Sequence, residues 1–381
     1  MITSELISAI QSSRRPIFIW GAGMRSYAEQ ARELARSLGI PVACTWAAID
    51  LMHHDDQLMA GGFGTHGTRA ANFAVQNSDL VLSLGSRLDT KATGFPAHFA
   101  RSAQICMVDI DVEEIAKFTK LGRKIDFPIF GGDVGKFIAV LDMATNEIHL
   151  PYELWFHWTK LIASWRRIYA DPQITWPGIN PYELMREIAQ YTTKDDILCS
   201  DTGFALGWTM QAFPFKGERF LHAFNMTPMG YGLPASVGAA FATGRRVILI
   251  TGDGSLMMSL SELSTVARWQ LPIKIVLLNN KGHGMCRQTQ RQWLGGSYPA
   301  TSLEGGLGFP NFLATAKAFG LGDWATLEHL FKDDKPGMCV IPIHPDAQLI
   351  PQAKYGQPIE DADPQLPREE FRKQMIVEPI S

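Results

Sequence analysis

Residues 246–280 read RVILITGDGSLMMSLSELSTVARWQLPIKIVLLNN, which predicts a strand, a glycine-rich turn, a helix and a second strand. Val247 to Ile250 is a short apolar run, as expected for a strand that is buried on both faces of a parallel sheet. The run leads into Gly252-Asp253-Gly254, where two glycines let the backbone turn tightly and approach a ligand. Since the first N–H groups of the following helix lack intrahelical partners, the turn predicts an anion site.

Hard oxygen ligands follow both strands of this stretch. Asp253 supplies a carboxylate after the first strand, and Asn279-Asn280 supply amide oxygens after the second, Ile273 to Leu278. Because the carboxyl ends of parallel strands meet at one edge of a sheet, these groups are placed to hold Mg²⁺ over a diphosphate. Gly-Asp-Gly alone is also an ordinary turn. The Asn-Asn pair, after 24 intervening residues and a second apolar strand, favours the metal–diphosphate site.

Composition indicates a globular protein of about two to three domains. The 381 residues are 46% hydrophobic and 19% charged with a formal net charge of −3, so no basic face favours nucleic acid as a partner. The five cysteines are odd in number and never paired as Cys-x-x-Cys, which argues against disulfides and zinc and fits a reducing cytoplasm. No apolar run of about 18 residues and no signal-peptide pattern occurs, so no membrane partner is expected.

The amino-terminal part predicts another α/β unit. A strand at Pro16 to Trp20 leads into Gly21-Ala22-Gly23 and a helical pattern that ends at Leu38. The turn is typical of nucleotide binding, but Ser26 replaces the third glycine and no acidic residue follows the next strand directly, so a bound nucleotide and a structural turn are both open. Further buried strands are predicted at Leu80 to Leu84 and Ile105 to Ile110. Strands alternating with helices predict a doubly wound parallel sheet.

The predicted domain organisation has three parts. Residues 1–150 form the first domain, and residues 151–178 form a linker helix whose four tryptophans, at 155, 158, 165 and 176, favour packing across two domains rather than a binding box. Residues 179–381 form the second α/β domain, which begins with a helix from Tyr182 and a strand at Ile197 to Ser200. The tail from Pro351 has no periodic pattern before Glu369 and predicts an extended arm.

The chain resembles the acetolactate synthase family of thiamine diphosphate enzymes, in the central and the C-terminal, diphosphate-binding domains. The resemblance covers nearly the whole chain and implies two Rossmann-like α/β domains of the thiamine diphosphate-binding fold. It rests on Gly67-Thr68, Ala71-Asn72, Ser78-Asp79-Leu80, Gly85, Arg87, Asp89 and Asp109-Ile110-Asp111 in the first half, and on Met229 to Pro234, Gly252 to Gly254, Glu262-Leu263, Asn279-Asn280 and Gly284-Met285 in the second.

The resemblance implies site residues in both domains. Asp253, Asn280 and the carbonyl of Gly282 would be Mg²⁺ ligands, Gly254 and Ser255 would donate N–H groups to the diphosphate, and Met229 would support bent thiamine. Gly203, Gly252 and Met285 complete the predicted cofactor site, and no catalytic residue is assigned. In flavin-containing relatives the central domain binds FAD, for which Gly21, Gly23, Arg87 and Asp89 match while Lys91 replaces an arginine, so FAD is a possible second cofactor.

Three departures qualify the resemblance. Where the family has Gly-Gln-His at the diphosphate, this chain has Gly203-Phe204-Ala205. Thr289 stands where the family has a tryptophan that helps to choose the second keto acid, which disfavours a role in branched-chain amino-acid synthesis. Residues 287–298 look more like acetolactate-synthase-like enzymes of surface-polysaccharide or unusual-sugar pathways. The family's pyrimidine-binding domain, with the glutamate that activates the cofactor, has no counterpart in this sequence, which predicts a separate pyrimidine-domain subunit.

These features predict one component of a carboligase or decarboxylase, a transferase or lyase that acts on a 2-keto acid such as pyruvate. The small residues and methionines of Phe224 to Gly244 predict an apolar surface that brings chains together, most simply as a homo-oligomer. A non-catalytic thiamine diphosphate-binding or regulatory protein is the alternative. A nicotinamide oxidoreductase is disfavoured because the third glycine and the ribose-binding acid are missing.

Overall fold

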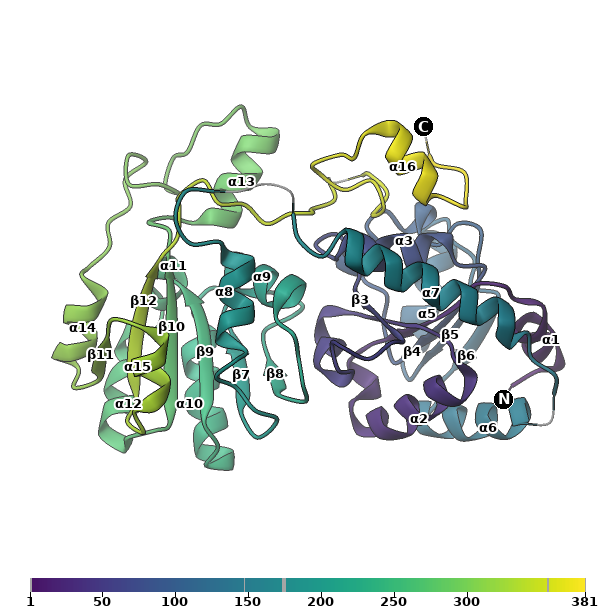
Figure 1. Ribbon diagram of the computed structural model, residues 1–381, viewed down its shortest axis with the longest axis horizontal. Coiled ribbons are helices and arrows are strands. Elements are labelled where there is room, and N and C mark those ends of the chain that lie inside the picture. The colour runs from purple at the N-terminus through teal and green to yellow at the C-terminus, as the bar shows by residue number, and fades with distance from the viewer. Residues whose placement is uncertain (1, 147, 173–175, 355, 381) are drawn as a thin grey trace. The chain divides into compact units, whose positions relative to one another are not determined.

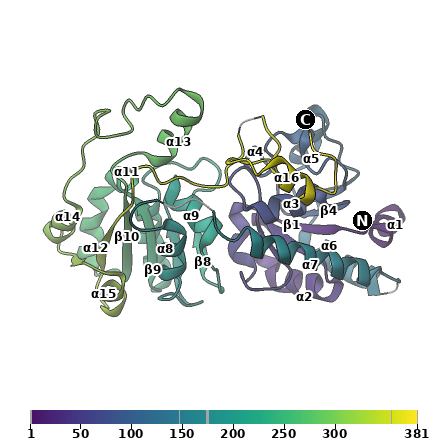
Figure 2. The same ribbon diagram turned by 45° about the horizontal axis from the view of Figure 1, so that its top comes forward.

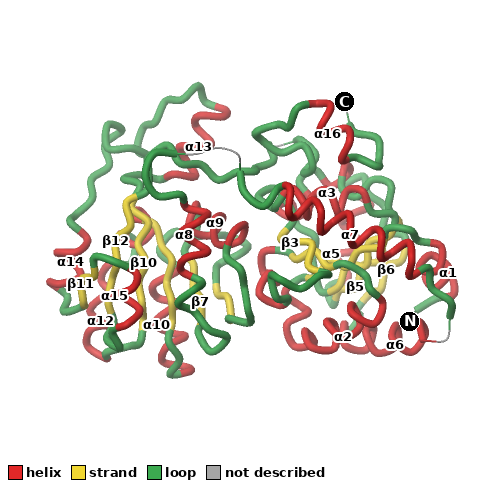
Figure 3. The backbone as a smooth tube through the Cα atoms, viewed as in Figure 1, coloured by secondary structure: helices red, strands yellow, loops and turns green. Residues whose placement is uncertain are grey.

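The computed structural model describes residues 2–146, 148–172, 176–354 and 356–380. The chain divides into two compact units, each described separately below. Unit 1 is Met1–Pro172 with Ile350–Ser381, and unit 2 is Gln173–Leu349. Each unit contains one sheet whose strands all run parallel, with helices packed against it, and Figure 3 shows the strands as a layer in each unit. The predicted fold class, two parallel-sheet α/β domains, is therefore confirmed.

Unit 1 has the strand order β3-β2-β1-β4-β5-β6. Its strands are β1 (Pro16–Trp20), β2 (Val42–Cys44), β3 (Met59–Gly62), β4 (Leu80–Leu84), β5 (Gln104–Asp109) and β6 (Phe127–Phe130). Its helices are α1 (Ser4–Ser12), η1 (Ala22–Tyr27), α2 (Ala28–Leu38), η2 (Trp46–Leu51), α3 (Arg69–Asn77), α4 (Thr90–Thr93), η3 (Pro96–His98), α5 (Val112–Lys120), α6 (Val134–Asn146), α7 (Tyr152–Ile168) and α16 (Arg368–Gln374).

The apolar strands form the centre of unit 1 because they are buried on both faces. All five residues of β1 and all five of β4 are buried, and the two strands pair in parallel. Their carboxyl ends approach so closely that a Cβ on Gly21 would lie 2.2 Å from the carbonyl oxygen of Gly85. Gly85 itself has φ +58. The glycines after these strands therefore allow two backbone turns to pack against each other.

The expected linker helix, α7, belongs to unit 1. Its buried face carries Trp155, Trp158 and Trp165, whose indole N–H groups donate to Ser13 O, Pro16 O and Gln374 Oε1. All three acceptors lie in unit 1. These acceptors lie before β1, at the start of β1 and at the end of α16, so the three tryptophans bond within unit 1. The packing of this helix across two domains stays a prediction. Trp176 lies in unit 2, where its ring stacks on Tyr182 at 6.4 Å.

The tail also belongs to unit 1, which differs from the predicted second domain of residues 179–381. Figures 1 and 2 show α16 beside α3. Asn77 accepts hydrogen bonds from the Ile376 and Val377 N–H groups, and Arg101 pairs with the buried Glu360 at 2.6 Å. Isolated side chains and backbone groups make these contacts, so they leave no periodic pattern in the sequence.

We predict that Phe371→Ala destabilises unit 1 by about 3 kcal/mol, since it truncates a buried aromatic side chain. Phe371 is 3% exposed and its ring centroid lies 6.3 Å from that of Phe73. Urea unfolding followed by tryptophan fluorescence measures the loss. Phe130→Ala is the matched control because Phe130 is 53% exposed. Equal stability of the two variants would place the tail outside the cooperative core of the unit.

Unit 2 has the strand order β11-β12-β10-β9-β7-β8. Its strands are β7 (Ile197–Ser200), β8 (Arg219–Leu221), β9 (Val247–Gly252), β10 (Ile273–Asn279), β11 (Gly322–Trp324) and β12 (Gly337–Pro342). Its helices are α8 (Pro181–Ile188), α9 (Phe204–Ala212), α10 (Gly232–Thr243), α11 (Asp253–Met257), η4 (Leu260–Glu262), α12 (Leu263–Trp269), α13 (Gly284–Trp293), α14 (Phe312–Ala318) and α15 (Leu327–Lys332). Among the described helices of the chain, none is both long and apolar enough to cross a bilayer.

Candidate functional site

A cavity of about 230 Å³ lies in unit 2. It is formed by the segments that follow β7, β8, β9 and β10, which are neighbouring strands of one parallel sheet. All predicted cofactor residues of this half line it, namely Gly203, Met229, Gly252, Asp253, Gly254, Ser255, Asn280, Gly282 and Met285. The fold thus brings together residues that are spread over more than eighty positions, as expected where parallel strands end at one edge.

Asp253 is the buried carboxylate of this cavity. It is 1% exposed and begins α11 directly after β9. Its Oδ1 accepts from the Gly254 N–H at 2.6 Å and its Oδ2 accepts from the Gly282 N–H at 3.3 Å. Burial raises the pKa of this carboxyl to about 6, although the backbone donors around it oppose the rise. No basic side chain of the described residues forms an ion pair with Asp253, so its charge is met only by N–H dipoles.

The segment after β10 folds back over Asp253. Asn280 is 8% exposed, and Lys281 adopts a left-handed conformation with φ +55. Gly282 forms an isolated antiparallel bridge with Ser302, and its carbonyl oxygen accepts from the Gly284 N–H at 3.1 Å. The Asp253 carboxylate, the Asn280 amide and the Gly282 backbone therefore line one cavity, as the sequence motif requires of an oxygen-ligand set.

Glycines set the shape of the cavity walls. A Cβ on Gly254 would lie 2.4 Å from His283 Nδ1 and 3.2 Å from the Met229 methyl carbon, whereas a Cβ on Gly252 would meet nothing within 4 Å. The wall at Gly254 is thus closed by His283 and Met229, while the space at Gly252 is open. Burial lowers the pKa of His283.

Sequence reasoning missed Asp201, which organises one side of the cavity. This carboxylate is 1% exposed and accepts from the N–H groups of Thr202 at 2.9 Å, Gly230 at 3.1 Å and Gly232 at 2.9 Å. The Ser255 hydroxyl also bonds it, while burial, the largest effect, raises its pKa. Asp201 thereby ties the end of β7 to the segment that carries Met229. The signal was present, because an acidic residue directly follows the buried strand Ile197–Ser200.

The predicted anion cradle is apolar at Phe204 and Ala205. Gly203 has φ +76 and precedes α9, so the Phe204 side chain begins the helix beside the cavity. A Cβ on Gly284 would lie 2.4 Å from the Phe204 ring, which also packs on Trp208 with centroids 4.8 Å apart. Phe204 therefore fixes the 280–285 segment by packing rather than by hydrogen bonding.

The predicted site residues of unit 1 have structural contacts of their own. A Cβ on Gly23 would lie 2.9 Å from Gly85 Cα, so both Gly21 and Gly23 serve the close approach of two turns. Asp89 caps α4 by accepting from the Lys91 and Ala92 N–H groups. Arg87 is half-exposed and lies 3.8 Å from Glu114. These residues are not part of the cavity in unit 2.

Two domain families match the chain. The family described as "Thiamine pyrophosphate enzyme, central domain" matches residues 3–141, and "Thiamine pyrophosphate enzyme, C-terminal TPP binding domain" matches residues 201–335. The first match lies in unit 1 and the second lies in unit 2. The second includes all the predicted cofactor residues that line the cavity.

Several acetolactate synthase large subunits are similar to the chain. The protein of Porphyra purpurea is 34% identical over 316 residues, which are 82% of this chain and 52% of that protein. Isozyme 1 of Escherichia coli K12 is 30% identical over 364 residues, or 92% of this chain and 62% of that protein. Isozyme 2 of the same strain is 34% identical over 305 residues. The chain spans about half to three-fifths of the length of these relatives.

Proposed function

Because this chain contains the central and C-terminal domains of the thiamine pyrophosphate enzymes, we propose that it is the diphosphate-binding part of a carboligase or decarboxylase that acts on a 2-keto acid such as pyruvate. The observation that carries the proposal is the buried Asp253, whose carboxylate lacks a basic partner among the described residues and shares a cavity with Asn280 and Gly282. Such a carboxylate is costly to bury unless a cation meets it.

The residues present fit thiamine diphosphate with Mg²⁺. Asp253, Asn280 and the Gly282 carbonyl offer three oxygen ligands of the kind that Mg²⁺ prefers. Ser255 and the open space at Gly252 would receive the diphosphate, and Met229, which also lines the cavity, would support the thiamine rings. The Gly254 N–H donates to Asp253 Oδ1 at 2.6 Å, and we propose that it holds this metal ligand in place rather than binding the phosphate.

The chemistry divides between the cofactor and the chain. When bound, thiamine diphosphate supplies the carbon nucleophile and the electron sink for decarboxylation of a 2-keto acid. The chain's own residues anchor the diphosphate through the metal ligands and exclude water with an apolar wall. Phe204, Trp208 and Met285 form that wall beside the polar end of the cavity. Desolvation there strengthens the electrostatic interactions of the bound groups.

The pyrimidine side of the cofactor requires residues other than those of this cavity. At about 230 Å³ the cavity is smaller than the ligand pockets of about 300–1,000 Å³ that are usual in proteins. Asp253 is the only acidic residue in its lining, and it is the proposed metal ligand. We therefore propose that a separate pyrimidine-binding subunit covers the cavity. The exposed Phe224, Met226 and Met258 give an apolar surface for such a partner and for a homo-oligomer. FAD in unit 1 stays a prediction.

We expect the purified chain with thiamine diphosphate, Mg²⁺ and pyruvate to release no CO₂ until a polypeptide with a pyrimidine-binding domain of this family is added. The reason is that the cavity lining offers no acid for the pyrimidine. A coupled assay of pyruvate consumption and CO₂ release measures both arms. Fast turnover by the chain alone would contradict the separate-subunit proposal. Cofactor binding without turnover in either arm would establish the non-catalytic binding protein instead.

A further inference from the structure

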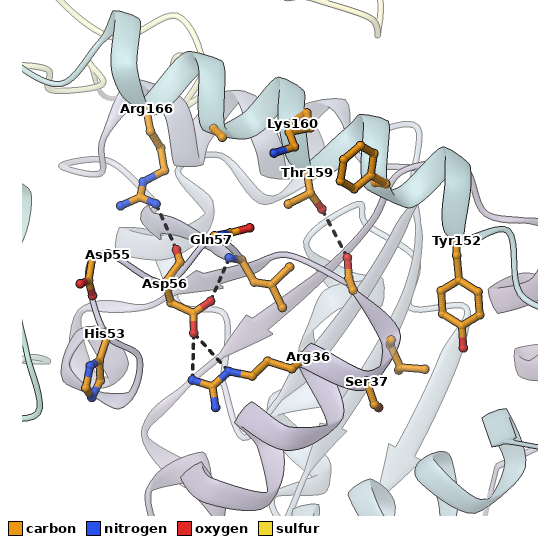
Figure 4. A pocket seen from close by; sticks show the side chains of 15 residues that line it. Arg36, Ser37, His53, Asp55, Asp56, Gln57, Tyr152, Thr159, Lys160 and Arg166 are labelled. Carbon is orange, nitrogen blue, oxygen red and sulfur yellow. Dashed lines mark hydrogen bonds and ion pairs between the residues drawn. The ribbon is translucent and has the colours of Figure 1, made fainter.

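A second cavity, of about 970 Å³, lies in unit 1 between α7, the end of α2 and the segment before β3 (Figure 4). We call it the α7 cavity. Gly39 precedes β2 and residues 53–58 precede β3, so this cavity lies at the amino ends of these strands. The glycine turn 21–23 and Arg87 follow β1 and β4 at the carboxyl ends. The α7 cavity is therefore separate from the place where a flavin is expected.

One face of α7 forms a wall of the cavity. Tyr152, Phe156, Lys160, Ala163 and Arg166 recur at three- or four-residue intervals, which places them along one side of a helix over about 20 Å. The opposite face holds the buried tryptophans. Tyr152 is 50% exposed and Phe156 is 58% exposed, so two aromatic rings stand open at this wall. Open aromatic rings beside a large cavity favour a ligand that covers them.

Hydrogen bonds join the walls of the α7 cavity and fix their positions. Figure 4 shows Arg166 reaching from α7 to the segment before β3, where its guanidinium donates to the carbonyl oxygens of His54 and Asp56. Arg36 binds the Asp56 carboxylate at 2.9 Å, and the Thr159 hydroxyl donates to Gly39 O at 3.3 Å. The cavity is thus preformed, which lowers the entropic cost of binding a ligand.

The charged side chains that line the α7 cavity indicate the charge of its ligand. Arg36 and Arg166 are engaged by the protein, whereas Lys160 forms no ion pair with the described residues, and its ammonium lies 5.1 Å from the Phe156 ring centroid. Arg36, Lys160 and Arg166 against Asp55 and Asp56 leave an excess of one positive charge in the lining. A ligand of low negative charge suits this balance, and a polyphosphate does not.

We propose that the α7 cavity binds a small organic anion that carries a planar aromatic ring. The anionic group pairs with Lys160, and the ring packs on Phe156 and Tyr152. This chemistry is shared by nucleoside monophosphates and aromatic carboxylates. The α7 cavity is independent of the cofactor site, because none of the residues that line it also lines the cavity in unit 2.

Calorimetric titration of the full chain with adenosine 5′-monophosphate and with indole-3-acetate tests the proposal, and adenosine and indole are the uncharged controls. We expect saturable binding of at least one anion, about tenfold tighter than its uncharged counterpart, since one charge pair is added. The tighter of the two anions identifies the source. If neither anion binds better than its uncharged counterpart, the proposal is wrong.

Variants locate the binding. Lys160→Met removes the positive charge and Phe156→Leu removes the aromatic ring, while both keep an apolar side chain. Each variant should weaken binding of the anion by about tenfold. Arg167→Met and Phe130→Leu are matched controls that should leave it unchanged, since Arg167 and Phe130 are exposed in unit 1 and do not line the cavity. If Arg87→Met abolishes nucleotide binding and Lys160→Met keeps it, the nucleotide binds at the carboxyl ends of the strands rather than in the α7 cavity. That result would overturn the proposal.

Discussion

Asp253→Ala should weaken the binding of thiamine diphosphate with Mg²⁺ by about a hundredfold or more, which is about 2.7 kcal/mol. The variant leaves the metal and the diphosphate with Asn280 and the Gly282 carbonyl as the remaining protein ligands of the proposed set. Asp253→Asn keeps the size of the side chain but loses its charge, and it should also bind poorly. Titration calorimetry in the presence and absence of a chelator measures both the affinity and its dependence on the metal.

Stability measurements separate this effect from misfolding. A carboxylate that is 1% exposed and has no basic partner among the described residues is costly for the folded state. In the absence of metal, Asp253→Asn should therefore unfold at the same temperature as the original chain or a higher one. Asp323→Asn is the matched control because it changes an exposed carboxylate of unit 2. Full affinity in Asp253→Ala, or binding that a chelator leaves unchanged, would remove the proposed metal site.

The sequence predicts the centre of both sheets well because an apolar run is a local signal. The predicted strands at Pro16–Trp20, Leu80–Leu84 and Ile197–Ser200 have these same bounds in the structure. The short strands escape this signal, since β3 reads Met-Ala-Gly-Gly and β8 has only three residues. Neighbouring strands supply their hydrogen bonds, and the local sequence does not specify that pairing.

Non-local contacts also explain what the sequence did not show of the site and of the tail. Asp201 binds the N–H groups of Gly230 and Gly232, which lie about thirty positions away. Phe371 packs beside Phe73, almost three hundred positions away. Motifs with fixed spacing, such as Gly252 to Gly254 with Asn279-Asn280, are visible in one dimension. Contacts made by single residues across a fold become visible only in the structure.

Asp201→Ala should destabilise unit 2 by about 3 kcal/mol, because it leaves one buried and two partly buried backbone N–H groups without their acceptor. The loss of these hydrogen bonds should also affect the cofactor site. Gly230 and Gly232 flank the turn after Met229, and Gly230 has φ +84 with a Cβ position only 2.6 Å from Met258 Cβ. Without the carboxylate this segment loses its anchor, so the affinity for thiamine diphosphate should fall by about tenfold even in the folded fraction.

Three measurements test the role of Asp201. Urea unfolding gives the change in stability, calorimetry gives the affinity, and limited proteolysis should cut the variant near residues 224–230 before it cuts the original chain. Asp201→Asn keeps one oxygen acceptor but directs its NH₂ group at another donor. Its stability and cofactor affinity should therefore lie between those of Asp201→Ala and those of the original chain. Asp195→Ala, an exposed change close in sequence, should alter none of the three. If Asp201→Ala lowers stability but keeps full affinity for the cofactor, the carboxylate supports the fold without positioning the Met229 segment.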